Sequence, residues 1–250
     1  MTPNSHMGEH YDKAEGWSSI ERKWAQVVDL SGGFEEVWSR RFSSSVRRAV
    51  RKAERSDINV VRDTTAQLLP QFHELYEKSV VRWAKQSGLP PAVALWRAAR
   101  RESLDKLRGL ATSMGESCVT WMAFVDGAPA ASIIVLTQGT HSHYWHGAMD
   151  LDLAGRVRAN DLLHKLAIEE ACTRGHDQYW LGRSNPDTGL WKFKAGFGAS
   201  PAPYATYTVE QLPLIQTRDV LRSTAKRAFR AKTRLQQRLR DQAQLPSQPR

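Results

Sequence analysis

Residues 117–149 contain three consecutive segments with the composition of β-strands. Ser117–Val125 and the apolar Pro129–Thr137 are separated by Asp126-Gly127, a dipeptide that favours a tight hairpin turn. His141–Met149 alternates along its length and predicts the third strand. Strands joined by such short connections pair as antiparallel neighbours, because a parallel connection needs a crossover of roughly a dozen residues or more. The sequence therefore predicts an antiparallel meander at the centre of the fold.

Segments on either side of this meander have the periodicity of amphipathic helices. Gln67–Trp83 and Asn160–Thr173 place their apolar residues along one side, and Ser43–Arg55 and Val93–Leu110 also have helical character. Four further short strands are expected at Trp24–Leu30, Ile58–Val61, Tyr179–Leu181 and Pro201–Val209. This order predicts an α/β fold of mixed α+β layers, in which helices flank a twisted, mostly antiparallel sheet.

The 250 residues are enough for one well-buried domain with appendages. We expect a disordered N-terminal segment at residues 1–19, a single folded domain at residues 20–212 and a basic helical tail at residues 213–250. The first segment lacks the apolar core of a signal peptide, and no stretch reaches the roughly 18 apolar residues that cross a bilayer. Cys118 and Cys172 form no CxxC pair and are interpreted as small buried thiols of a reducing compartment. A cytoplasmic protein is therefore expected.

The charge balance is strongly basic, with 36 Lys+Arg against 26 Asp+Glu and a formal net charge of +10. Such a surplus favours a polyanionic partner such as nucleic acid, a phosphorylated ligand or an anionic membrane, with a solvated basic surface as the alternative. One basic cluster lies on the predicted helix at residues 43–55 and comprises Arg47, Arg48, Arg51, Lys52 and Arg55. A second cluster lies in the tail and includes Arg222, Lys226, Arg227 and Arg230. Both are candidate RNA- or phosphate-binding surfaces.

The segment Leu181–Gly198 reads LGRSNPDTGLWKFKAGFG and is expected to be a loop with a brief helix. A strand ending in DLS, a basic helix with RRAVRKAER and a central hairpin with GAPAASIIV accompany it. This combination resembles the FemABX-like and CelD-type members of the GNAT superfamily over roughly Trp24–Val209. The resemblance implies a GNAT-like domain in which a central strand splays from its neighbour. An acyl donor then enters one side of the wedge and an amine acceptor the other.

FemABX-like enzymes usually carry two such domains, whereas this chain is long enough for one. It resembles instead the single-domain relatives that tailor antibiotics and peptides. The resemblance also implies that Lys194 carries the chemistry, because it matches the lysine of the Phe-Lys pair in those enzymes. There the lysine stabilises the oxyanion that develops at an ester carbonyl. The residues alone also allow a surface lysine on a packed short helix.

Substrate-binding residues are expected near this lysine and on the third strand of the meander. Arg183 follows Gly182 at a strand end, where ligands of layered α/β folds tend to bind, and its guanidinium can hold a phosphate in bidentate fashion. The alternative for this turn is a structural cap formed by Ser184 and Asn185. The complete set of predicted substrate-binding residues is Arg183, Ser184, Phe193, Tyr144 and Trp145.

Three histidines of the third strand do not predict a metal site. His141 and His143 share one strand face, whereas His146 points to the other. No nearby cysteine or paired carboxylate completes a ligand set. We therefore expect no metal and interpret these side chains as strand surface or pocket lining.

The segment Leu153–Asp161 (LAGRVRAND) occupies the place of the glycine-rich loop with which CoA-dependent GNAT enzymes bind a pyrophosphate. Arg156 could be the first residue of such a loop, but Ala159 and Asp161 replace both glycines. The Cβ of Ala159 would crowd a closely approaching phosphate. The segment therefore argues against acetyl-CoA as the acyl donor.

Together these features predict a cytoplasmic N-acyltransferase with no bound cofactor. It would transfer an aminoacyl group from aminoacyl-tRNA, its co-substrate, to an amine of a small peptide, natural product or cell-wall precursor. An acyl-CoA-dependent N-acyltransferase is one alternative, and a non-catalytic RNA- or membrane-binding module with a degenerate GNAT core is another. Transfer RNA is the expected macromolecular partner, and peripheral membrane contact stays open.

Overall fold

A computed structural model describes residues 19–186 and 188–208 of the chain. The strands are β1 (Ser19–Asp29), β2 (Ile58–Asp63), β3 (Cys118–Val125), β4 (Ala128–Gln138), β5 (His141–Met149), β6 (Gln178–Arg183) and β7 (Ser200–Thr208). They form one sheet in the order β2-β3-β4-β5-β6-β1-β7. Neighbours from β2 to β5 pair antiparallel, as do β1 and β6, whereas β5 and β6 pair parallel. The predicted α/β class with a mostly antiparallel sheet is confirmed.

Helices follow the strands in the expected order. They are α2 (Gly33–Glu36), the π-helix η1 (Val37–Arg41), α3 (Ser44–Glu54), α4 (Leu69–Ser87), α5 (Pro91–Arg101), α6 (Leu104–Met114), the short 3-10 turn η2 (Gly115–Ser117), α7 (Leu151–Val157), α8 (Ala159–Thr173) and α9 (Gly189–Gly196). In the described part of the chain, each helix is too short or too polar to cross a membrane.

The chain divides into two compact units. One comprises Met1–Arg22 with Ala205–Arg250, and of this unit the structure describes only the beginning of β1 and the end of β7. The other, Lys23–Tyr204, contains all the described helices and the remaining strand residues. The predicted basic helical tail at residues 213–250 lies outside the described residues.

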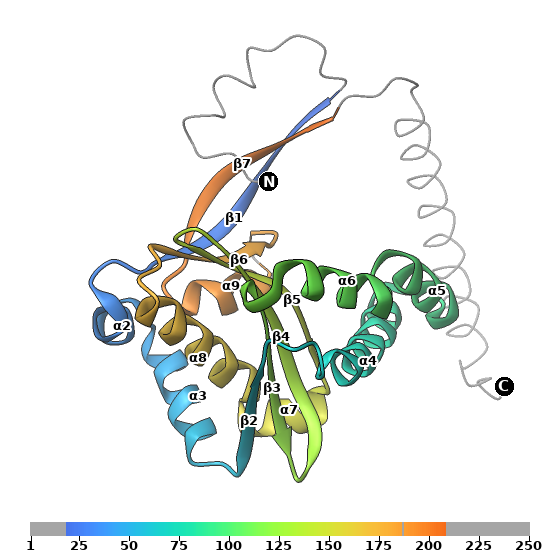
Figure 1. The fold of residues 1–250 in the computed structure, drawn as a ribbon, viewed down its shortest axis with the longest axis horizontal. Coiled ribbons are helices and arrows are strands. Elements are labelled where there is room, and N and C mark those ends of the chain that lie inside the picture. The colour runs from blue at the N-terminus through green and yellow to red at the C-terminus, as the bar shows by residue number, and fades with distance from the viewer. Residues whose placement is uncertain (1–18, 187, 209–250) are drawn as a thin grey trace, which may run out of the picture. The chain divides into compact units, whose positions relative to one another are not determined.

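Helices lie on both faces of the sheet in the larger unit (Figure 1), and an apolar core fills the space on each face. On one face α8 packs on β3 and β4 and α3 packs on α8, and the fully buried side chains include Val50, Leu163 and Phe197, the residue after α9. On the other face α4 and α6 cover the strands and α5 packs on α4, with Phe72 and Leu75 among the buried side chains. Because both faces are covered, side chains that alternate along a central strand enter two different cores.

Three local expectations can be compared with the structure. The hairpin turn is confirmed, because Asp126 and Gly127 both have positive φ angles, 51° and 75°. The single helical region at Val93–Leu110 is wrong: α5 ends at Arg101, and the side chain of Ser103 caps a new helix by accepting a hydrogen bond from the Lys106 backbone. The predicted thiols are both free, and burial raises the pKa of each to about 11.

Candidate active site

The parallel strands β5 and β6 pair over only three residue pairs, the last of which joins His143 to Trp180. Beyond this pair β5 continues to Met149 and β6 to Arg183, outside the register that joins them. A bulge places Trp145 as an extra residue opposite β4, and such bulges bend a strand away from its neighbour. The ladder between the two strands therefore ends at His143 and Trp180, and the unpaired region beyond this pair is called the wedge.

Helix α9 places Lys194 against the β6 side of this wedge. The helix starts at the cap residue Thr188, and its last residue accepts a hydrogen bond of 2.8 Å from the Ser43 backbone N–H before α3. Lys194 is only 3% exposed, which rules out the surface lysine considered above. Its Nζ donates to the backbone carbonyls of Gly182 at 3.2 Å and Arg183 at 2.9 Å. An ammonium group has three N–H donors, so one remains for a further acceptor.

The burial of Lys194 also changes its protonation. Removal of the ammonium group from solvent lowers its pKa from 10.5 to about 8. At neutral pH the group is still mostly charged, and its charge acts in surroundings of low polarity. A buried ammonium ion that is held in place by two hydrogen bonds can stabilise an oxyanion more strongly than a solvated one.

His143 lies beside the same strand end. A Cβ built on Gly182 would be 3.6 Å from His143 Nε2, and the φ of Gly182 is 70°, a conformation that favours glycine. The imidazole is exposed, yet the protein atoms packed around it and the Lys194 ammonium lower its pKa. It is therefore mostly neutral near pH 7 and can accept a proton. From the sequence, His143 is interpreted only as strand surface or pocket lining. The residues next to it in the chain do not indicate that β6 and α9 lie beside it in the fold.

A second histidine, His164 of α8, is buried beneath the wedge. Its ring lies 4.7 Å from that of Tyr144 and 5.6 Å from that of Phe193, centroid to centroid. Both ring nitrogens, like the hydroxyl of Tyr179, lack a hydrogen-bond partner within the described residues. Burial and the Lys194 charge lower the pKa of His164 to about 3, so the ring is neutral. Unpaired buried polar atoms are energetically costly, and three of them gather here on two rings whose centroids are 6.5 Å apart.

The predicted substrate-binding residues take different positions. Arg183 is exposed at the end of β6, as a ligand-binding residue requires. Ser184 is buried and donates a 2.6 Å hydrogen bond to the side chain of Gln26, which in turn donates to the Trp191 carbonyl at 3.1 Å. These hydrogen bonds connect the end of β6 to β1 and α9. The Ser184 hydroxyl therefore has a structural role rather than the predicted contact with substrate.

Tyr144 and Trp145 are adjacent in sequence but enter opposite cores. Tyr144 packs against the core of α3, α8 and α9, together with Phe193, whereas Trp145 packs against the core of α4, α5 and α6. Room for the Tyr144 ring depends on Gly147, where a Cβ would be 2.2 Å from the Tyr144 hydroxyl. Of the predicted set, the structure thus brings Tyr144 and Phe193 together around His164 and directs Trp145 away from them.

The predicted basic cluster of α3 contains one structural arginine and four exposed side chains. Arg47 donates hydrogen bonds to the carbonyls of Trp38, Ser39 and Phe42, at the end of η1, and so supports the chain before α3. The exposed members of the cluster are Arg48, Arg51, Lys52 and Arg55. The predicted tail residues Arg222, Lys226, Arg227 and Arg230 lie outside the described residues.

The candidate pyrophosphate loop contains a helix. Asp150 caps α7, which is followed by Arg158 with a φ of 62° and then directly by α8. Ala159 is fully buried, and Asp161 in the first turn of α8 is 8% exposed, with its pKa raised by burial. The N-terminal turn of α8 therefore contains a carboxyl group of the protein at the position where a helix attracts anions.

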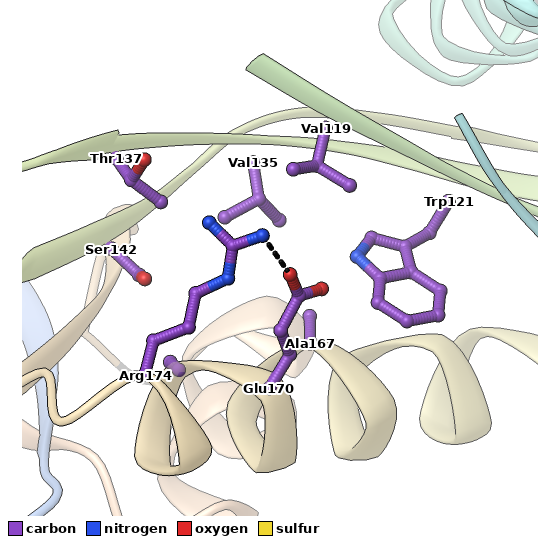
Figure 2. Close-up of a pocket in the computed structure, with 9 residues that line it drawn as sticks. Val119, Trp121, Val135, Thr137, Ser142, Ala167, Glu170 and Arg174 are labelled. Carbon is purple, nitrogen blue, oxygen red and sulfur yellow. Dashed lines mark ion pairs between the residues drawn. The ribbon is translucent and has the colours of Figure 1, made fainter. Parts of the chain in front are cut away.

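Lys194 lines neither of two hollows that lie within the larger unit. One, between the sheet and α8, has a volume of about 10 Å³, the size of a single water. Figure 2 shows Arg174 and Glu170 facing each other within it, as an ion pair of 2.7 Å. The other, of about 430 Å³, lies at the Gln178 end of β6, away from the wedge. Among the described residues, no group of three or more His, Cys, Asp or Glu side chains is placed to hold a metal ion.

Comparisons with known proteins agree with this geometry. The family model described as "Acetyltransferase (GNAT) domain" matches residues 40–194, a range that contains the wedge and ends at Lys194. The C-terminal domain (DUF2156) of a putative lysylphosphatidylglycerol synthetase from Agrobacterium fabrum has a TM-score of 0.53 at 14% identity, over 82% of this chain and 66% of that one. L-PGS from Bacillus licheniformis has a TM-score of 0.53 at 10% identity, over 90% and 70%.

FemX has a TM-score of 0.44 at 12% identity, over 81% of this chain and 65% of its own. The chain thus spans just under two thirds of the length of FemX and of the Agrobacterium protein. No curated protein is similar enough in sequence to match. At these identities the two structures with a TM-score of 0.53 show a shared fold alone.

Proposed function

Because this chain belongs to the family of acetyltransferase (GNAT) domains, we propose that it is an aminoacyl-tRNA-dependent N-acyltransferase. The acceptor would be an amine of a small peptide, natural product or cell-wall precursor. The observation that carries the proposal is Lys194, a buried ammonium that uses two of its three donors on β6 carbonyls. Such a preorganised donor suits a reaction in which negative charge develops on an acyl oxygen.

In the proposed reaction the acceptor nitrogen attacks the ester carbonyl carbon of the aminoacyl group. The carbonyl oxygen gains negative charge and accepts a hydrogen bond from Lys194 Nζ. His143 takes a proton from the attacking nitrogen, and the tetrahedral intermediate collapses to an amide. The ribose oxygen leaves with the electron pair of the broken ester bond and takes up a proton, which His143 can return.

Two features support tRNA over CoA as the donor carrier. Asp161 places a carboxyl group in the first turn of α8, where it would compete with a bound pyrophosphate. The exposed cations of α3 add a positive surface suited to a longer phosphate backbone. If the chain were instead an acyl-CoA-dependent enzyme, it would bind CoA with clear affinity.

The donor test uses the purified chain. We expect no CoA binding below the millimolar range by titration calorimetry, and transfer of labelled amino acid from aminoacyl-tRNA to a panel of amines. Asp161→Asn serves as the matched variant, because it removes the charge and keeps the size of the side chain. Micromolar CoA affinity, or transfer from acetyl-CoA alone, would replace the tRNA proposal with the CoA-dependent one.

His143→Gln is expected to slow transfer by about a hundredfold, the lower end of what general base catalysis contributes. Glutamine keeps hydrogen-bonding capacity but cannot accept the proton. In the wild type, transfer should fall as pH drops through the lowered pKa of His143, because the protonated ring is no longer a base. The variant should lose this acidic limb.

The matched control is His141→Gln, an exposed histidine two positions earlier on β5. It should keep both the rate and the pH profile of the wild type. If His143→Gln transfers at the wild-type rate across the pH range, His143 is not the base, and the attacking amine loses its proton to solvent.

A further inference from the structure

Helix α5 exposes its apolar residues to an unusual degree. Only Ala94 and Ala98 of its 11 residues are buried. Trp96 is 60% exposed and Val93 38% exposed, and Ala92 and Ala99 are exposed as well. The spacing of positions 92, 93, 96 and 99 puts these residues along one face of the helix. A continuous apolar stripe of this kind, facing away from the core, indicates a binding surface.

Basic side chains flank the stripe. Arg97 and Arg100 are exposed, and the guanidinium of Arg100 lies 5.0 Å from the centroid of the Trp96 ring. The eleven residues of α5, PAVALWRAARR, include no acidic side chain. A second exposed tryptophan, Trp83 of the neighbouring helix α4, is 45% exposed and has Arg82 at 5.9 Å.

We propose that this face of α5 docks on an anionic lipid bilayer. Tryptophan and short aliphatic side chains enter the boundary between headgroups and acyl chains, while arginines at the edge of the stripe pair with lipid phosphates. A single-stranded RNA would use the indole and the arginines but would leave Val93 and the alanines without a role. Arg100 already covers one face of the indole, which reduces the stacking surface available to a base.

The proposal is independent of the acyl donor and of Lys194. It predicts that a soluble amine is acylated at the same rate whether or not the α5 face is intact. The membrane contact would instead matter for an acceptor that is itself held at a bilayer.

The test is co-sedimentation of the full chain with vesicles of phosphatidylcholine alone or mixed with phosphatidylglycerol. At about 0.3 M salt, where charges more than a few ångströms apart are screened, binding through the basic surplus alone is weakened and apolar insertion persists. We expect the wild type to bind the anionic vesicles and Trp96→Ala to bind at least about tenfold more weakly. Vesicles with brominated acyl chains should quench the fluorescence of the wild type more than that of the variant.

Trp24→Ala is the matched control, since Trp24 is 48% exposed on β1, outside the α5 face. It should bind vesicles as the wild type does, and thermal melting checks that both variants fold. Equal vesicle binding by Trp96→Ala and the wild type would overturn the proposal. A Trp96→Ala variant that loses affinity for tRNA but keeps its affinity for vesicles would assign the surface to RNA instead.

Discussion

Lys194→Met is expected to give a folded protein that has lost most of its transfer activity. Methionine keeps much of the length of the side chain but removes the charge and the donors. Loss of one preorganised oxyanion donor typically costs about 3 kcal/mol, or about a hundredfold in turnover. Single-turnover transfer from labelled aminoacyl-tRNA measures this effect without interference from product release.

The control for this variant lies on the same helix. Lys192 of α9 is exposed, so Lys192→Met changes the same kind of charge without touching the wedge, and it should transfer normally. Near-normal transfer by a well-folded Lys194→Met would remove Lys194 from the mechanism and make Arg183 the next candidate.

The lowered pKa of Lys194 predicts the direction in which stability and transfer activity change with pH. Because its pKa is about 8 in the folded chain against 10.5 ordinarily, the unfolded chain binds more protons between these values. The contribution of this group to stability therefore rises with pH from about 8 to 10.5, and Lys194→Met should lack that rise. Transfer by the wild type should fall as the pH rises through about 8, where the folded chain loses this proton.

Gly198→Ala is expected to be the most destabilising single methyl addition in the motif that carries Lys194. The φ of Gly198 is 79°, which costs a residue with a Cβ about 1–2 kcal/mol. The added Cβ would also lie 2.7 Å from Arg41 Cβ and 2.8 Å from the Arg41 carbonyl oxygen, and such overpacking costs about 1–3 kcal/mol. We expect denaturant titration to show a loss of roughly 2–5 kcal/mol in unfolding free energy.

Gly109→Ala supplies the comparison. Gly109 is inside α6, and a Cβ there would meet no atom within 4 Å. Alanine should therefore stabilise the chain by about 0.5–1 kcal/mol, since glycine is a poor helix former. If Gly198→Ala were as stable as the wild type, the chain after α9 would be free to move away from Arg41, and the position of Lys194 would be less constrained than the geometry indicates.

Local pattern in the sequence was sufficient for the meander, the Asp126-Gly127 turn, the long helices and the class of the fold. These features depend on residues that are close together along the chain, where periodicity and turn propensity act directly. The resemblance carried by the stretch around Phe193 and Lys194 also selected the buried lysine at the wedge. Lys194 could be chosen from the sequence because its motif is local. Its burial could not be predicted, because burial depends on the surrounding elements.

Other features required the folded chain, because they join residues that are distant in sequence. The hydrogen bonds from Ser184 to Gln26 and from Gln26 to Trp191 span 158 and 165 positions, and no local pattern encodes them. The same holds for His143 beside Gly182, an approach set by the splay of β5 and β6. Tyr144 and Trp145, in contrast, enter different cores because successive side chains of a strand point to opposite faces, which the alternation of the strand alone could have predicted. The sequence by itself determined the class of the fold, most of its elements and the choice of Lys194 as a candidate. The tertiary structure decided where α5 ends and α6 begins, and which side chains surround that lysine, since those neighbours are brought together only when the sheet forms.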